Sequence, residues 1–294
     1  MSNRISGGLA VGGSQFKEKA FRILFMFTAC ISILAVITIC LFLFANGLPT
    51  MHKIGWLEFL GGTVWRPSND IYGLFPMIVA SVYVTAGALV IGVPLGLLTA
   101  VFLVFFCPAK LYKILKPALD LLAGIPSVVY GFFGLVVIVP IMQNFGGSGK
   151  NMLTASILLG IMILPTMVNV SETSLRAVPS LYYEGARALG TTHELSVFRT
   201  VVPAAKSGIT AGIVLATGRA IGEALAVSMV AGNQAIMPES IFDGVRTLTA
   251  NIVLEMGYAA DLHRDALIAT AVVLFVFILI INTCFSLLKK GEKI

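Results

Sequence analysis

This 294-residue chain contains the stretch Tyr183-Glu184-Gly185-Ala186-Arg187-Ala188-Leu189-Gly190, and Pro203 follows thirteen positions after Gly190. It lies between two strongly apolar segments. A short helix rich in Ala and Gly lets another protein approach its backbone closely, because small side chains leave the backbone accessible. The charges of Glu184 and Arg187 stay at the water boundary. The pattern predicts a docking segment, and a plain connection between membrane helices is the alternative.

The composition is that of an integral membrane protein. Hydrophobic residues make up 57% of the chain and charged residues only 12%, whereas a soluble domain has about 25% charged residues. The net charge of +6 is not gathered into a block of consecutive basic residues, so the sequence argues against a nucleic-acid partner. The four cysteines show no CxxC or Cys/His spacing and are expected to be free thiols.

The hydrophobic pattern predicts an all-α membrane fold. One crossing takes about 20 apolar residues, and the first apolar stretch is interpreted as a retained anchor because it is longer than the core of a signal peptide. Residues 1–20 form a flexible cytoplasmic tail in this prediction, and residues 21–290 form one membrane domain. Its six expected spans lie at about 21–44, 74–106, 118–142, 153–171, 207–231 and 266–288.

Basic residues set the expected topology. Fourteen Lys and Arg residues lie on the odd-numbered aqueous segments and five on the opposite ones. Because basic loops stay in the cytoplasm, both termini and the segment 179–203 are predicted to be cytoplasmic, where a docking segment is needed. Two outer segments are longer than simple turns, 45–73 and 232–265. They are interpreted as lids, as docking surfaces or as segments that only rest at the membrane interface.

The outer segment 232–265 contains an expected short helix at Thr247–Met256, with Leu248 and Ile252 at helical spacing. If the segment receives a delivery protein, crosslinkers at Asn251 and Glu255 are expected to capture that partner.

Among the residues of the predicted spans, Arg219 and Glu223 have the highest free-energy cost of placement in the apolar layer. Counting from Lys206 at about 1.5 Å per helical residue places Arg219 roughly 20 Å into an apolar layer about 30 Å thick. A central Arg costs about 2.5 to 3.5 kcal/mol on insertion scales. A structural pair at i, i+4 is one interpretation, although Arg before Glu is the poorer order. The favoured hypothesis is a charged element on an anion path, as a gate or as a ligand.

Motifs for other chemistry are missing from the sequence. Gly146-Gly147-Ser148-Gly149-Lys150 is not a phosphate-binding P-loop, because Asn144 and Asn151 occupy positions that need Gly and Ser or Thr. His52, His193 and His263 form no metal or catalytic spacing. We therefore expect no enzymatic activity, no metal site and no cofactor bound by this chain.

The segment from Glu184 to Pro203 resembles the EAA loop of ABC-importer permeases. The family form is Glu-Ala-Ala, three residues, Gly, nine residues, Ile, one residue, Leu-Pro. Glu184, Ala186, Gly190 and Pro203 match it, while Gly185 stands in place of the first Ala. Thr200 and Val202 replace the Ile and Leu. The resemblance implies that Glu184, Gly185, Ala186, Gly190 and Pro203 couple the chain to an ATPase.

Four segments together resemble the PstC-type permeases of bacterial phosphate ABC importers: Leu122–Gly134, the Glu184 loop, Gly218–Glu223 and Val245–Ile252. Trp65-Arg66-Pro67 favours this type over the sister type, PstA. The resemblance implies a six-helix type I importer bundle in the cytoplasmic membrane, moving phosphate by alternating access.

The implied partners are a PstA-like permease, two PstB-like ATPases that bind ATP and Mg, a PstS-like binding protein and membrane lipid. Another oxyanion or solute permease of the same fold, or a self-contained channel or secondary carrier, is the alternative.

Overall fold

The chain is mostly helical in the computed structural model, which describes residues 11–290. The helices are α1 (Val11–Ile54), α2 (Trp56–Gly61), α3 (Phe75–Val101), α4 (Ala109–Gly124), α5 (Ser127–Phe133), α6 (Val139–Gln143), α7 (Met152–Arg176), α8 (Ser180–Ala188), α9 (His193–Ser196), α10 (Val202–Ala204), α11 (Lys206–Gly222), α12 (Leu225–Val230), α13 (Leu248–Glu255) and α14 (Asp261–Lys290). The shorter elements are the hairpin strands β1 (Trp65–Arg66) and β2 (Ile71–Tyr72), the 3-10 turn η1 (Pro67–Asn69) and the π-helical segments η2 (Phe102–Phe106), η3 (Gly134–Ile138) and η4 (Val197–Val201).

Four helices are long and apolar enough to cross a membrane: Phe21–Ile54, Phe75–Phe106, Met152–Arg176 and Asp261–Cys284. Two further crossings arise only if each of two bent helix pairs is one span. Ala109–Gly124 meets Ser127–Gln143 at 100°, and His193–Ala204 meets Lys206–Gly222 at 69°. The six-span count therefore stays a prediction.

Several boundaries differ from the sequence-based expectation. The first apolar helix runs to Ile54 rather than ending near residue 44, and the expected third span, 118–142, is bent at Ile125 and Pro126. The helix α1 begins at Val11, so the second half of the expected flexible tail is helical, whereas residues 1–10 lie outside the described part. The expected fifth span, 207–231, is interrupted at Glu223, where the backbone is extended. The short helix expected within Thr247–Met256 is confirmed as α13, with the Thr247 hydroxyl as its cap.

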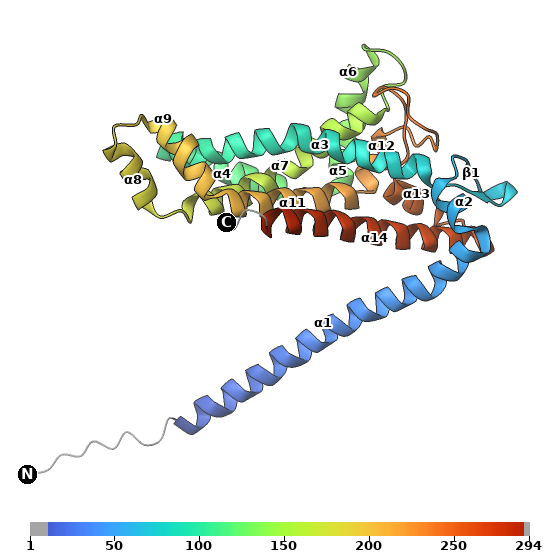
Figure 1. The fold of residues 1–294 in the computed structure, drawn as a ribbon, viewed down its shortest axis with the longest axis horizontal. Helices are drawn as coiled ribbons and strands as arrows, with labels where there is room; N and C mark the ends of the chain where they lie inside the picture. Colours follow the sequence, from blue (N-terminus) through green and yellow to red (C-terminus); the bar gives the residue numbers. More distant parts are fainter. Residues whose placement is uncertain (1–10, 291–294) are drawn as a thin grey trace, which may run out of the picture.

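The helices α3, α7, α11 and α14 run side by side (Figure 1). Glycines set the separation of α3 from α7: a Cβ on Gly92 would lie 2.6 Å from Ile163 and 2.8 Å from the Gly160 carbonyl oxygen, and one on Gly96 would lie 2.7 Å from Met167. The backbones are thus in near contact, as small residues allow in membrane bundles. This packing makes α7 the centre of the bundle.

The helix α1 leaves the bundle and contacts it near its C-terminal end, against α14 and α2 (Figure 1). There Gly47 packs closely on Ala269 and Val272. Further toward the N-terminus its apolar side chains are exposed, including Phe25 at 67% and Leu41 at 66%. Lipid or another protein must cover a surface this apolar.

Gly92→Leu tests the α3–α7 contact. Because the new side chain would overlap α7, we expect a loss of about 1 to 3 kcal/mol of stability, typical of overpacking. The midpoint of thermal unfolding in detergent should fall accordingly. Gly218→Leu is the control, since a Cβ at Gly218 meets no atom within 4 Å. An unchanged midpoint for Gly92→Leu would contradict the backbone contact.

Candidate functional site

Arg219 and Glu223 do not lie on one continuous helix. The helix α11 ends at Gly222, and Glu223 adopts φ −72° and ψ 125°. Arg219 Nη1 donates to Thr166 Oγ1 on α7 at 3.2 Å. Glu223 Oε1 instead accepts from the Ala226 backbone N–H at 3.0 Å. Within residues 11–290 the two side chains form no ion pair with each other, so a structural i, i+4 pair does not describe this arrangement.

The break after Gly222 is held by hydrogen bonds from two directions. The Glu223 carboxylate satisfies a free N–H at the start of α12, as an N-terminal cap does. The Glu223 carbonyl oxygen accepts from Thr249 Oγ1 at 2.8 Å, which ties the break to α13. Arg219 occupies the last turn of α11, where the helix dipole favours a cation.

A second bend packs against α11, the helix that carries Arg219. The helices α4 and α5 meet at 100° around Ile125 and Pro126, and Tyr130 on α5 donates its hydroxyl proton to the Leu122 carbonyl oxygen of α4 at 2.8 Å. Tyr130 belongs to the same buried cluster as Ala220 of α11.

The structure reveals a polar group that the sequence analysis did not identify, here called the Lys116 cluster: Lys116, Asp120, Asn169 and Glu172. Lys116 Nζ lies 2.5 Å from Asn169 Oδ1, 3.1 Å from Glu172 Oε2 and 3.3 Å from Asp120 Oδ1. Asn169 Nδ2 donates to Asp120 Oδ1 at 3.2 Å.

Glu172 is buried, with 4% of its surface exposed, and it also accepts hydrogen bonds from Tyr112 and Arg176. The signal that could have found this cluster is the spacing of Thr166, Asn169 and Glu172. Residues three apart share one face of a helix, and all three are polar in a helix with mean hydropathy 1.9 over its most apolar window.

The predicted coupling segment forms α8 and the turn after it. None of the α8 residues is buried, and Glu184, Gly185 and Arg187 are exposed. Gly190 has φ +84°, a conformation that other residues rarely adopt. The turn is closed by Thr191, whose hydroxyl donates to the Ala186 carbonyl oxygen at 2.8 Å.

Further along the same segment, Pro203 is exposed on α10, next to the bend between α10 and α11. The structure thus places Glu184, Gly185, Ala186, Gly190 and Pro203 on one surface-exposed segment at one end of the bundle (Figure 1).

His193 connects this segment to α3. Its Nδ1 lies 2.8 Å from the Tyr183 hydroxyl of α8, and its Nε2 lies 3.3 Å from the Phe105 carbonyl oxygen in η2. The ring packs edge-on against Phe106 at 4.8 Å between centroids. A neutral imidazole with its proton on Nε2 satisfies both hydrogen bonds, so one side chain joins α8, α9 and the end of α3.

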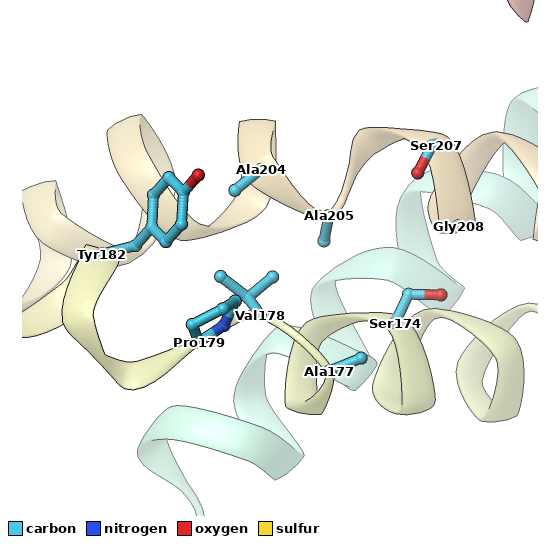
Figure 2. Close-up of a pocket in the computed structure, with 9 residues that line it drawn as sticks. All are labelled: Ser174, Ala177, Val178, Pro179, Tyr182, Ala204, Ala205, Ser207 and Gly208. Carbon is cyan, nitrogen blue, oxygen red and sulfur yellow. The ribbon is translucent and has the colours of Figure 1, made fainter.

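A pocket of about 420 Å³ lies between the α7–α8 connection and the α10–α11 bend, the two segments that attach the coupling segment to the bundle. Figure 2 shows Pro179 of the α7–α8 connection and Tyr182 of α8 on one side of the pocket. Ala204 of α10 and Ala205 of the α10–α11 bend lie on the other side. At one end of the pocket lining, Gly208 of α11 packs directly on Ser174 of α7. The coupling segment is thus joined to the bundle by two connections, one at the end of α7 and one at the start of α11.

At the opposite end, Glu255 organises the outer segment. The carboxylate is 6% exposed and accepts from Trp65 Nε1 at 2.8 Å. It also contacts His263 Nε2 at 2.8 Å and pairs with Arg246. Asn251 is fully buried. The expectation that crosslinkers at Asn251 and Glu255 would reach a partner is therefore wrong, because both side chains are used inside the fold.

Electrostatics reinforce this outer packing. Burial, together with the neighbouring Asp70, raises the pKa of Tyr72 to about 12. Tyr72 therefore stays neutral, and it packs edge-on against Trp65 at 5.3 Å between ring centroids.

No group of three potential metal ligands occurs among the described residues. Cys30, Cys40, Cys107 and Cys284 are free thiols.

Comparisons with known proteins agree with this architecture. Residues 92–291 match the family model described as binding-protein-dependent transport system inner membrane component. The probable ABC transporter permease YqgH of Bacillus subtilis is 39% identical over 91% of both chains. The phosphate transport system permease PstC of Mesorhizobium japonicum is 34% identical over 81% of this chain and 80% of that protein. A probable PstC of Methanocaldococcus jannaschii is 31% identical over 82% and 84%.

Solved structures show the same fold. A bacterial ABC transporter that imports the polysaccharide alginate aligns with TM-score 0.65 at 14% identity, over 95% of this chain and all of that chain. The MetNI methionine transporter in an inward-facing conformation aligns with TM-score 0.56 at 19% identity, over 74% and 94%. The relatives are transporter permeases, so this chain is a transport subunit rather than an enzyme. It belongs to the family of binding-protein-dependent transport system inner membrane components.

Proposed function

We propose that this chain is the membrane subunit through which an ABC importer moves inorganic phosphate into a bacterial cell. The observation that carries the proposal is Arg219, a partly buried cation that donates a hydrogen bond to the neutral hydroxyl of Thr166. Relatives named as phosphate permeases at 34% and 31% identity support this choice of anion.

The chemistry of Arg219 suits a tetrahedral oxyanion. A guanidinium has five N–H donors and binds phosphate oxygens in pairs. Glu223 is engaged at the start of α12, so its carboxylate does not pair with Arg219. Among residues 11–290 the guanidinium donates to Thr166 alone, which leaves its other donors to bind an anion. Fixed donors replace the water that the anion loses on entering an apolar passage.

The coupling role is assigned to the exposed segment that contains α8. An ATPase groove that receives Glu184, Gly185, Ala186 and Gly190 would push on α7 through Pro179 and on α11 through Pro203. A PstA-like permease completes the path, two PstB-like ATPases bind ATP and Mg, and a PstS-like protein delivers phosphate from outside. In this arrangement both termini and α8 are cytoplasmic.

Arg219→Gln tests the path. A neutral amide cannot offset the desolvation of the anion, so uptake of radiolabelled phosphate into vesicles that carry the assembled importer should fall at least tenfold. Assembly with the ATPase should persist, because α8 is distant from Arg219. Thr166→Val removes only the hydroxyl partner and should have a much smaller effect. Wild-type uptake by Arg219→Gln would refute the path role.

Gly185→Trp tests docking with little disturbance of the chain itself. A Cβ at Gly185 meets no atom within 4 Å, whereas any change at Gly190 also strains its positive φ. We expect the Trp to block the ATPase groove and to lower binding-protein-stimulated ATP hydrolysis at least tenfold. Gly61→Trp is the matched control, equally open but on α2 at the other end of the molecule (Figure 1). Full stimulation in Gly185→Trp would exclude docking there.

A further inference from the structure

Two cations line one face of α7. Arg219 Nη1 is bound to Thr166, and Lys116 Nζ is bound to Asn169. Thr166 and Asn169 are three residues apart, so they share a helix face and differ by about 4.5 Å along the axis. Lys116 therefore lies roughly one helical turn beyond Arg219, toward the end of the bundle that carries α8.

One partner of Lys116, Asp120, can be replaced by an anion. Its ion pair with Asp120 is the longer of its two pairs, 3.3 Å against 3.1 Å to Glu172, and the Asp120 side chain is 51% exposed. Exposed ion pairs contribute little to stability. An anion that arrives at Lys116 can replace Asp120 and release that carboxylate to water.

The second partner, Glu172, is held independently of Lys116. Its Oε1 accepts from the Tyr112 hydroxyl at 2.7 Å and from Arg176 Nε at 3.0 Å. Its Oε2 faces Lys116 without a well-aligned hydrogen bond. Lys116 thus retains donor capacity, while Glu172 stays fixed by the other two residues.

We infer that Lys116 is a second binding residue for a tetrahedral oxyanion, on the cytoplasmic side of Arg219. Asn169 Nδ2, which now donates to Asp120, would supply a neutral donor to the same anion. The side chain of Lys116 is 25% exposed and that of Asp120 is 51% exposed, so an anion can reach Lys116 from the Asp120 side. The inference rests on the proposed transport of phosphate, and it adds a second anion-binding position to the path.

A purely structural role makes a different prediction. If Lys116 only joins α4 to α7, its loss does harm because Glu172 is left buried and less compensated. Lys116→Gln combined with Glu172→Gln removes both charges and should then restore function. If Lys116 receives the anion, the double variant stays as defective as the single one.

The test uses the assembled importer in phosphatidylcholine vesicles, with its binding protein and radiolabelled inorganic phosphate. We expect Lys116→Gln, alone and with Glu172→Gln, to lower uptake at least tenfold, while copurification of the ATPase and stimulated ATP hydrolysis stay within twofold of wild type. Lys116→Arg should retain most uptake. Lys110→Gln, at an exposed lysine on the first turn of the same helix, should be normal.

Recovery of uptake in the double variant would overturn the inference in favour of a structural link. The same vesicles with phosphatidylglycerol added separate a free anion from a lipid headgroup. A defect that appears only with the anionic lipid would assign Lys116 to headgroups and also overturn it. Normal uptake by Lys116→Gln refutes this inference alone, whereas absence of phosphate uptake by the wild-type importer refutes the proposed function itself.

Discussion

The need to satisfy every polar group inside an apolar bundle governs this structure. The chain leaves helical geometry at Pro126 and at Glu223, and each departure is stabilised locally. Tyr130 binds the Leu122 carbonyl oxygen at the first bend, and Glu223 caps α12 at the second. The second bend begins at the end of α11, four residues after Arg219, and it directs the Glu223 carboxylate to the Ala226 N–H. The interruption that costs backbone hydrogen bonds therefore also keeps Glu223 from pairing with Arg219.

Close packing supplies the rigid part of the molecule. Glycines bring α3 onto one side of α7 at Gly92, and Gly208 brings α11 onto Ser174. The helices α4 and α8 differ, because neither contains a buried residue. Elements with few buried contacts have the lowest local stability. The chain thus combines a closely packed frame of three helices with two helices on its surface. Of these two, α4 carries Lys116 and Asp120, and α8 carries part of the coupling surface.

Local patterns predicted those parts of the molecule that local forces determine. Apolar runs indicated the long helices, the spacing around Leu248 indicated α13, and the Ala/Gly content of 183–190 indicated α8. The break at Glu223 was missed because the residues around it are equally compatible with a continuous helix. It depends on Thr249, which binds the Glu223 carbonyl oxygen from a distant part of the chain.

The Lys116 cluster was missed for a similar reason, since Lys116 and Glu172 meet only after α4 packs on α7. The burial of Glu255 likewise depends on Trp65 from a hairpin far away in sequence. Such tertiary contacts also indicate how a push on α8 reaches Arg219. The coupling segment starts where α7 ends and finishes where α11 begins, and these helices are locked together at Ser174 and Gly208. A displacement of α8 should therefore carry Thr166 and Arg219 together and change their position relative to α4, which contacts the bundle through apolar side chains such as Leu115 and Leu119 as well as through Lys116. The oxyanion would then pass between a frame that moves as one body and α4.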